Sequence, residues 1–206
     1  MAMSNLAVRV IAACVFVPAF LGLMWLGGPA FYALVMLVTF GASWEYFTIT
    51  GFRKDRWSFA FAVKIAMIVA VATTLLPLRY LGPALIAAMM AVALWHMLRF
   101  GDMPTAVSRA GVMFFGVVYA GVLPTMFWHL RVLPEGRGWV LMVLAIVWLA
   151  DTGAYFTGRA LGRHKMYSAV SPGKSWEGAV GGLASSVGGA LLCRALFMPQ
   201  LPVAEV

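Results

Sequence analysis

The stretch VIAACVFVPAFLGLMWLGGPAFYALVMLVTF, residues 10–40, decides the fold class of this chain. It consists of two apolar runs without a charged residue, joined by Gly27, Gly28 and Pro29. A transmembrane helix needs about 20 mainly apolar residues, and each run extends to that length. The stretch therefore predicts two membrane spans, near 7–26 and 29–48, joined by a tight turn.

The composition extends this prediction to the whole chain. Of the 206 residues, 63% are hydrophobic and 11% are charged, whereas a soluble domain has about 25% charged residues. We therefore expect an all-α, polytopic transmembrane helix bundle of about seven spans, forming a single membrane domain over residues 1–206. The expected spans lie near 7–26, 29–48, 59–77, 83–99, 109–130, 138–157 and 178–198, with a basic cytoplasmic loop at 158–177.

The net charge of +8 has a positional explanation. In a soluble protein it would suggest nucleic acid, but cytoplasmic loops of membrane proteins collect Lys and Arg, so no nucleic-acid partner is expected. With the N-terminus in the cytoplasm, ten cations lie inside and three outside, which places Val206 outside. The inside cations are Arg9, Arg53, Lys54, Arg56, Arg99, Arg109, Arg159, Arg163, Lys165 and Lys174; the outside ones are Arg79, Arg131 and Arg137.

Small residues follow one face of the last expected span. Gly178, Gly182, Ser186 and Ala190 recur at intervals of four. Small residues let helix backbones approach closely in lipid, so this face predicts tight packing, either within the bundle or in a homodimer.

Asp151 is an acid inside the sixth span. Such residues cost about 2.5–3.5 kcal/mol at mid-membrane and usually face a cavity or a partner. We expect it about 10 Å from the cytoplasmic end of its helix, at 1.5 Å per residue. It either serves a site or pairs structurally with a cation such as Arg159.

The stretch SPGKSWEG, residues 171–178, has the ingredients of a phosphate site. Gly173 allows close backbone approach, Lys174 supplies charge, and two serines flank them. The stretch enters the N-terminus of the last helix, where unpaired N–H groups favour anions. A Walker A loop is excluded because Ser168 stands where that motif needs glycine.

Four other polar residues stand out from the apolar background. Glu45 ends the second span and is either an interfacial anchor or part of a site, and His164 is a candidate phosphate contact. His96 and His129 stand among apolar residues and are expected to be core or interfacial histidines.

The residues from the sixth span to the last resemble a known family. The resemblance rests on DTGAYF at 151–156, Gly158-Arg159, GRHK at 162–165, VSPGKSWEG at 170–178 and Gly181-Gly182. This order and spacing is similar to bacterial phosphatidate cytidylyltransferase, the CDP-diacylglycerol synthase family. Trp44-Glu45 and Gly51-Phe52 also look like that family's second-span ending.

The resemblance implies an activity and a set of roles. CTP and phosphatidic acid would give CDP-diacylglycerol and pyrophosphate, with Mg²⁺, at the cytoplasmic face of the bacterial inner membrane. Asp151 and Lys174 are the expected catalytic residues. The expected substrate-binding residues are Arg159, Lys165, Ser171, Gly173, Ser175 and Glu177.

The sequence departs from the family at its C-terminal signature. Family members carry Lys-Asp, Pro-Gly-His-Gly-Gly and Asp-Arg-x-Asp there, whose aspartates bind metal, whereas this sequence contains no His-Gly-Gly. We therefore expect a C-terminally truncated chain, inactive alone, with metal ligands unassigned and Asp151 the remaining candidate. Two alternatives stay open: a CTP-dependent polyisoprenoid lipid kinase, and an anion transporter, although the paired broken helices common in transporters are missing.

Overall fold

A computed structural model describes residues 5–99, 103–168 and 170–202, with side chains from residue 14 onward. The side chain of Arg9, residues 100–102 of the expected fourth loop, and Val206 lie outside this description. A single membrane domain was expected. The helices gather in two compact units, Met1–His129 (unit 1) and Leu130–Val206 (unit 2), and each unit is described by itself.

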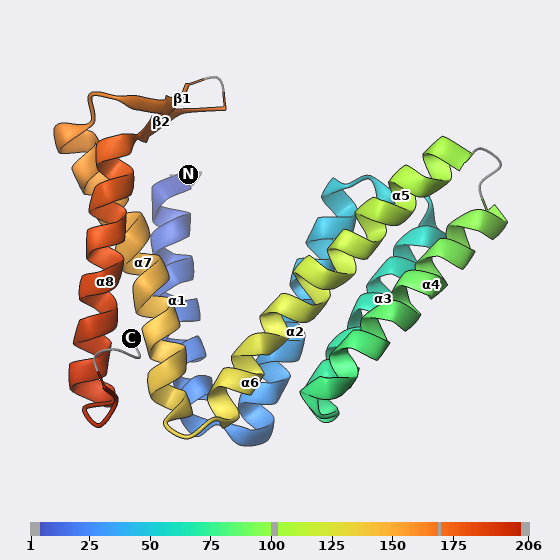
Figure 1. Cartoon of the computed structure of the whole chain (residues 1–206), viewed down its shortest axis with the longest axis horizontal. Coiled ribbons are helices and arrows are strands. Elements are labelled where there is room, and N and C mark those ends of the chain that lie inside the picture. Colours follow the sequence, from blue (N-terminus) through green and yellow to red (C-terminus); the bar gives the residue numbers. More distant parts are fainter. Residues whose placement is uncertain (1–4, 100–102, 169, 203–206) are drawn as a thin grey trace. The chain divides into compact units, whose positions relative to one another are not determined.

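Unit 1 is built of helices (Figure 1). Its long helices are α1 (Asn5–Leu26), α2 (Gly28–Ile49), α3 (Arg56–Leu75), α4 (Leu81–Arg99) and α5 (Met103–Gly116). Shorter elements are η1 (Phe52–Lys54), η2 (Leu78–Tyr80), the π-helical η3 (Val117–Val122), η4 (Leu123–Thr125) and α6 (Met126–Val132), which continues into unit 2.

Unit 2 has two long helices and a hairpin. They are α7 (Gly136–Leu161), β1 (Lys165–Tyr167), β2 (Ser171–Ser175) and α8 (Trp176–Phe197). Helices α7 and α8 lie side by side along their length, and the hairpin caps one end of the pair (Figure 1). The hairpin corrects the expected loop at 158–177: α7 continues to Leu161, two strands occupy half of the remainder, and α8 begins at Trp176.

The helices confirm an all-α polytopic membrane protein. Within the described residues, six helical segments are long and apolar enough to cross a bilayer, and Cys14–Leu26 adds a shorter apolar helix. Many large apolar side chains along them are exposed, such as Leu37, Met90 and Val180. In a bilayer these side chains contact lipid rather than water, so the exposure carries no hydrophobic cost.

The turn between the first two spans follows from its glycines. Gly27 and Gly28 have φ angles of 69° and 52°, in the region that residues with a Cβ adopt rarely. Pro29 follows in the first turn of α2, where its missing N–H costs no helical hydrogen bond. The chain therefore reverses within a few residues between two apolar helices.

The fifth span changes its helical geometry near a proline. Pro124 has no N–H, so the carbonyl of Ala120, four residues earlier, lacks its usual helical partner. The hydroxyl of buried Ser43 on α2 donates to this carbonyl at 3.3 Å. An uncompensated buried carbonyl would cost about 1–3 kcal/mol, so Ser43 stabilises the irregular span from the neighbouring helix.

The two lone histidines make backbone contacts, as expected for core residues. His96 is buried, and its Nδ1 lies 2.9 Å from the Val92 carbonyl. His129 Nε2 lies 2.9 Å from the Thr73 carbonyl. Glu45 is exposed on α2.

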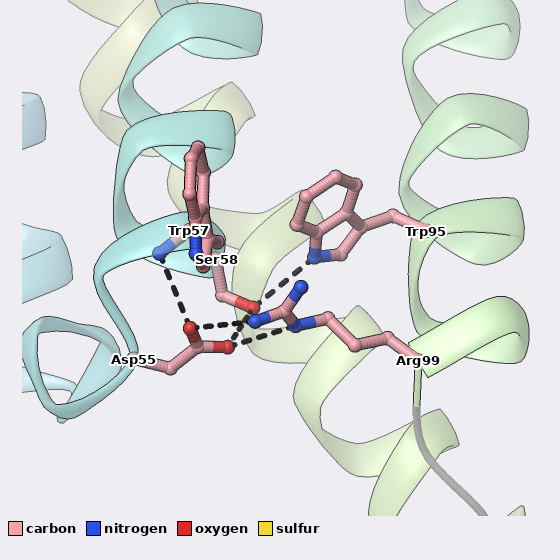
Figure 2. A network of polar contacts seen from close by, with 5 residues as sticks. All are labelled: Asp55, Trp57, Ser58, Trp95 and Arg99. Carbon is pink, nitrogen blue, oxygen red and sulfur yellow. Dashed lines mark hydrogen bonds and ion pairs between the residues drawn. The ribbon is translucent and has the colours of Figure 1, made fainter.

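A polar network joins the start of α3 to the end of α4 (Figure 2). Asp55 is the N-cap of α3 and accepts from the Trp57 amide at 3.1 Å. Its carboxylate also accepts from Ser58 at 2.7 Å and from two nitrogens of Arg99 at 2.9 and 3.1 Å. Trp95 donates to the Ser58 hydroxyl at 3.1 Å. One carboxylate thus fixes two helix ends.

We expect Asp55→Ala to lower the free energy of unfolding by about 1–2 kcal/mol, because it removes a helix cap and the acceptor for Arg99. Burial acts to raise the pKa of Asp55, but the hydrogen bonds from Ser58 and Arg99 outweigh it and hold this pKa below its ordinary value of 3.8. A lowered folded-state pKa stabilises the fold above the unfolded-state pKa, and this contribution is lost as pH falls through the folded-state value.

Thermal unfolding in detergent at neutral and acidic pH measures both effects. The difference between wild type and Asp55→Ala should be full at pH 7 and shrink below about pH 3.8. Glu45→Ala removes an exposed carboxylate of the same unit and should stay within about 0.5 kcal/mol of wild type. An equal effect of the two variants would refute the role of the network.

The small-residue face of α8 packs against α7. A Cβ added to Gly182 would lie 2.9 Å from the Ala150 carbonyl oxygen, and one added to Gly178 would lie 2.9 Å from that of Ala154. Gly178, Gly182 and Ala190 are buried by this contact. The face thus serves packing within the chain, so the small residues no longer argue for a homodimer.

Gly182→Ala should therefore destabilise unit 2 by about 1–3 kcal/mol, because the new methyl group meets backbone atoms. Gly188, on the same helix, has nothing within 4 Å of an added Cβ. Gly188→Ala should be neutral or stabilising by up to about 1 kcal/mol. Thermal unfolding of the two variants side by side is the measurement, and equal stabilities would contradict the packing.

Candidate functional site

A cavity of about 830 Å³ lies between α7, the hairpin and the start of α8. The α7 residues that line it recur every three or four positions, so they lie on one face of the helix. The lining residues are Asp151, Ala154, Tyr155, Gly158, Arg159, Gly162, Lys165, Met166, Ser171, Gly173, Lys174, Ser175, Gly178 and Ala179.

The cavity brings together seven of the eight residues expected at the site. Six come from the expected loop and one, Asp151, from within the span. The seven are Asp151, Arg159, Lys165, Ser171, Gly173, Lys174 and Ser175. Their assigned roles stay predictions, because proximity alone does not show what they bind.

The hairpin carries most of these residues. Strands β1 and β2 are antiparallel, with Lys165 opposite Ser175 and Tyr167 opposite Ser171. The turn is closed by a hydrogen bond from the Val170 amide to the Tyr167 carbonyl at 3.2 Å. This register places Lys165 beside Ser175, the N-cap of α8.

Ser175 has a structural task as well as a place at the cavity. It is buried, caps α8, and accepts from the Gly178 amide at 3.2 Å. A Cβ at Gly162 would lie 2.7 Å from its Oγ, and one at Gly158 would lie 3.3 Å away. The glycines of the motif thus make room for this serine, which the sequence assigned to substrate alone.

The N-terminus of α8 is not the open anion site that the sequence predicted. The Trp176 amide donates to the His164 carbonyl at 3.0 Å, and the Gly178 amide to Ser175. Protein groups therefore already engage these two amides, and side chains supply the positive charge for an anion.

Glu177 is the expected site residue that does not line the cavity. Its carboxylate instead contacts His164, with 2.6 Å from Oε1 to Nδ1 and 3.2 and 3.3 Å from its oxygens to the His164 amide. His164 likewise does not line the cavity. The sequence predicted an acid near substrate, and the structure has an acid that binds the start of the hairpin.

Asp151 lies deeper than predicted. Because α7 continues to Leu161, ten residues separate Asp151 from the helix end, which is about 15 Å at 1.5 Å per residue. Within the described residues the ion pairs are Arg99–Asp55 and His164–Glu177. Arg159 instead donates to the Tyr155 hydroxyl at 3.0 Å. The structural pairing of Asp151 with Arg159 is therefore not found, and Asp151 faces the cavity.

Cations dominate the lining. The lining holds three cations and a single carboxylate, that of Asp151; the cations are Arg159, Lys165 and Lys174. Such a lining favours a polyanion and holds charged donors ready for phosphate oxygens. Ser171 and the Gly173 backbone add neutral hydrogen-bonding groups.

The described residues do not form a metal site by themselves. Mg²⁺ is usually held by one or two carboxylates together with phosphate oxygens and water. Asp151 is the single carboxylate of the cavity lining, and no cluster of three His, Cys, Asp or Glu side chains occurs in residues 14–99, 103–168 and 170–202. The chain offers a divalent ion one ligand here.

Tyr155 and Met166 also line the cavity, and sequence reasoning did not select them. Tyr155 stands four residues after Asp151 and four before Arg159. That helical spacing was a signal that could have identified it.

Comparison with known proteins identifies the chain. The model of the cytidylyltransferase family matches residues 7–205. The chain belongs to the cytidylyltransferase family. The resemblance in the cavity motif is thus confirmed, and the match extends over nearly the whole chain.

Relatives that match most of the chain are named phosphatidate cytidylyltransferase. That of Pseudomonas aeruginosa is 36% identical over 184 residues, which cover 85% of this chain and 66% of that protein. That of Brucella suis is 31% identical over 200 residues, covering 94% and 69%. The chain thus spans about two thirds of the length of these relatives.

A third relative matches over a shorter region. The phosphatidate cytidylyltransferase of Haemophilus influenzae is 49% identical over 69 residues, 33% of this chain and 24% of that protein.

Proposed function

We propose that this membrane protein transfers CMP from CTP to phosphatidic acid, forming CDP-diacylglycerol and pyrophosphate. The observation that carries the proposal is a cavity with three cations and one acid at the end of two apolar helices. A cavity in this place would let a water-soluble triphosphate meet a lipid phosphate at the bilayer. The names of the relatives support this reaction.

The transfer needs no covalent enzyme intermediate. A phosphate oxygen of phosphatidic acid attacks the α-phosphorus of CTP. The bond from that phosphorus to the oxygen between the α- and β-phosphates breaks. Pyrophosphate leaves with the electron pair. Catalysis then rests on positioning the two phosphates and on neutralising charge.

The cavity residues have distinct proposed roles. Lys174 and Lys165, both on the hairpin, neutralise the triphosphate, while Ser171 and the Gly173 amide donate hydrogen bonds to it. Arg159 lies on α7, which belongs to the spanning part, and is proposed to bind the lipid phosphate. Asp151 is proposed to lie beside a cation that orients substrate, or to contribute a ligand to Mg²⁺, which would neutralise further phosphate charge when bound.

We propose the cytoplasmic face of the bacterial inner membrane as the location of the cavity. Ten of the chain's cations fall on the side that holds the expected basic loop and three on the other, a bias typical of cytoplasmic loops. CTP is a cytoplasmic nucleotide, so the same face supplies the soluble substrate.

Labelled CTP tests the proposal on the purified chain in lipid nanodiscs containing phosphatidic acid. Saturable binding of CTP supports the nucleotide site. Arrival of label from the α-phosphate, and not the γ-phosphate, on lipid supports the transferase and would contradict the expectation that this chain is inactive alone. Transfer of the γ-phosphate to a lipid would instead indicate a kinase. Absence of saturable CTP binding by the folded chain would refute the nucleotide site.

A further inference from the structure

The pair formed by His164 and Glu177 lies outside the cavity but at the root of the hairpin. Glu177 accepts from the His164 amide with both oxygens and lies 2.6 Å from its ring nitrogen. The carboxylate is the sheltered partner, with its side chain 25% exposed against 79% for His164. An exposed residue that precedes β1 is thus bound by an acid on the first turn of α8.

Backbone hydrogen bonds also connect His164 to the start of α8. The Trp176 amide donates to the His164 carbonyl at 3.0 Å, so both backbone groups of His164 are bound by residues of α8. The next residue, Lys165, pairs with Ser175 in the hairpin and lines the cavity. Glu177 therefore binds the residue directly before β1, next in sequence to a cavity cation.

We infer that Glu177 is a positioning residue: by binding His164, it holds Lys165 and the first strand of the hairpin at the cavity. The inference rests on the proposed function, because it assigns Lys165 to the nucleotide phosphates. It replaces the expected direct contact between Glu177 and substrate with an action through the hairpin.

Charge and position make opposite predictions for this residue. Removing a negative charge near a polyanion site should tighten nucleotide binding by electrostatics alone, because like charges repel. Loss of the hairpin anchor should weaken binding, because Lys165 is then no longer held in place. Weaker CTP binding by the Glu177→Ala variant would therefore favour the positioning role over the effect of charge.

The test combines hydrogen exchange with CTP binding in nanodiscs. In Glu177→Ala, amides of the segment 162–176 should exchange at least about tenfold faster than in wild type, since local opening costs less. CTP affinity should fall about three- to tenfold, the range for one charge-assisted hydrogen bond lost in part. Glu177→Gln keeps one acceptor oxygen and should recover part of both effects.

Two further variants sharpen the result. Glu135→Gln also removes one negative charge from unit 2, at the N-cap of α7, and should leave exchange in 162–176 unchanged. Lys165→Ala should weaken CTP binding without faster exchange. In the double variant Glu177→Ala/Lys165→Ala, the loss of affinity should be smaller than the product of the single losses, because both act through the same cation.

The outcomes distinguish this inference from the proposed function. Unchanged exchange in Glu177→Ala, or single losses that multiply in the double variant, overturns the positioning role while CTP binding by wild type upholds the function. If wild type fails to bind CTP, the proposed function fails together with the role of Lys165. The exchange measurement then still decides whether Glu177 anchors the hairpin.

Discussion

Lys174→Ala is expected to reduce the affinity of the chain for CTP by about 10- to 100-fold, the effect of losing a charge-assisted hydrogen bond of about 1.5–3 kcal/mol. Lys174 lies on β2, lines the cavity and is exposed there. Its side chain has no hydrogen bond or ion pair with another described residue in the structure. The substitution should therefore remove a phosphate contact without disturbing the fold.

Lys54→Ala is the matched control. Lys54 is an exposed lysine on η1 of unit 1, so this variant makes the same chemical change and the same change of net charge. Titration of both variants in nanodiscs should give a loss for Lys174→Ala and wild-type affinity for Lys54→Ala. Equal affinities would mean that net charge, and not the hairpin, attracts the nucleotide.

Asp151→Leu is expected to stabilise the chain while impairing its site. An acid at mid-membrane costs up to about 3 kcal/mol on insertion scales. The two ion pairs among the described residues do not include Asp151, so neither of them offsets that cost. Replacing it should therefore raise the free energy of unfolding, by less than the full 3 kcal/mol because the cavity admits water.

Thermal unfolding of Asp151→Leu and Asp151→Asn measures this gain. Titration of each variant with CTP in the presence of Mg²⁺ measures the loss of affinity at the site. Asp55 supplies the contrast, because this acid caps α3 and forms an ion pair with Arg99, so its removal should destabilise the fold. A destabilised Asp151→Leu would instead show that Asp151 is a structural acid of helix packing.

The fold class could be predicted because it depends on composition. The apolar runs and the Gly-Gly-Pro break at 27–29 require only the length rule for spans and the backbone freedom of glycine. The end of α7 could not be placed, because Gly158 and Arg159 look like loop residues in the sequence. In the structure both belong to the helix, with Gly158 close to Gly178 of α8.

The cavity residues could be predicted from the motif, but their contacts could not. The hairpin was missed because Pro172 and Gly173 are disfavoured in strands, although both fall in β2. The pairing of Glu177 with His164 depends on that hairpin, since thirteen residues separate the two in sequence. The network of Asp55 and Arg99 is likewise a tertiary contact, across 44 residues, that no local pattern indicates.

Photolabelling with an azido derivative of CTP tests the central claim most directly. The chain in nanodiscs is labelled, digested and analysed by mass spectrometry, with unlabelled CTP as competitor. Our account predicts competable label within residues 151–179, on α7, the hairpin or the start of α8. Competable label confined to Met1–His129, or label that CTP does not displace, would contradict it.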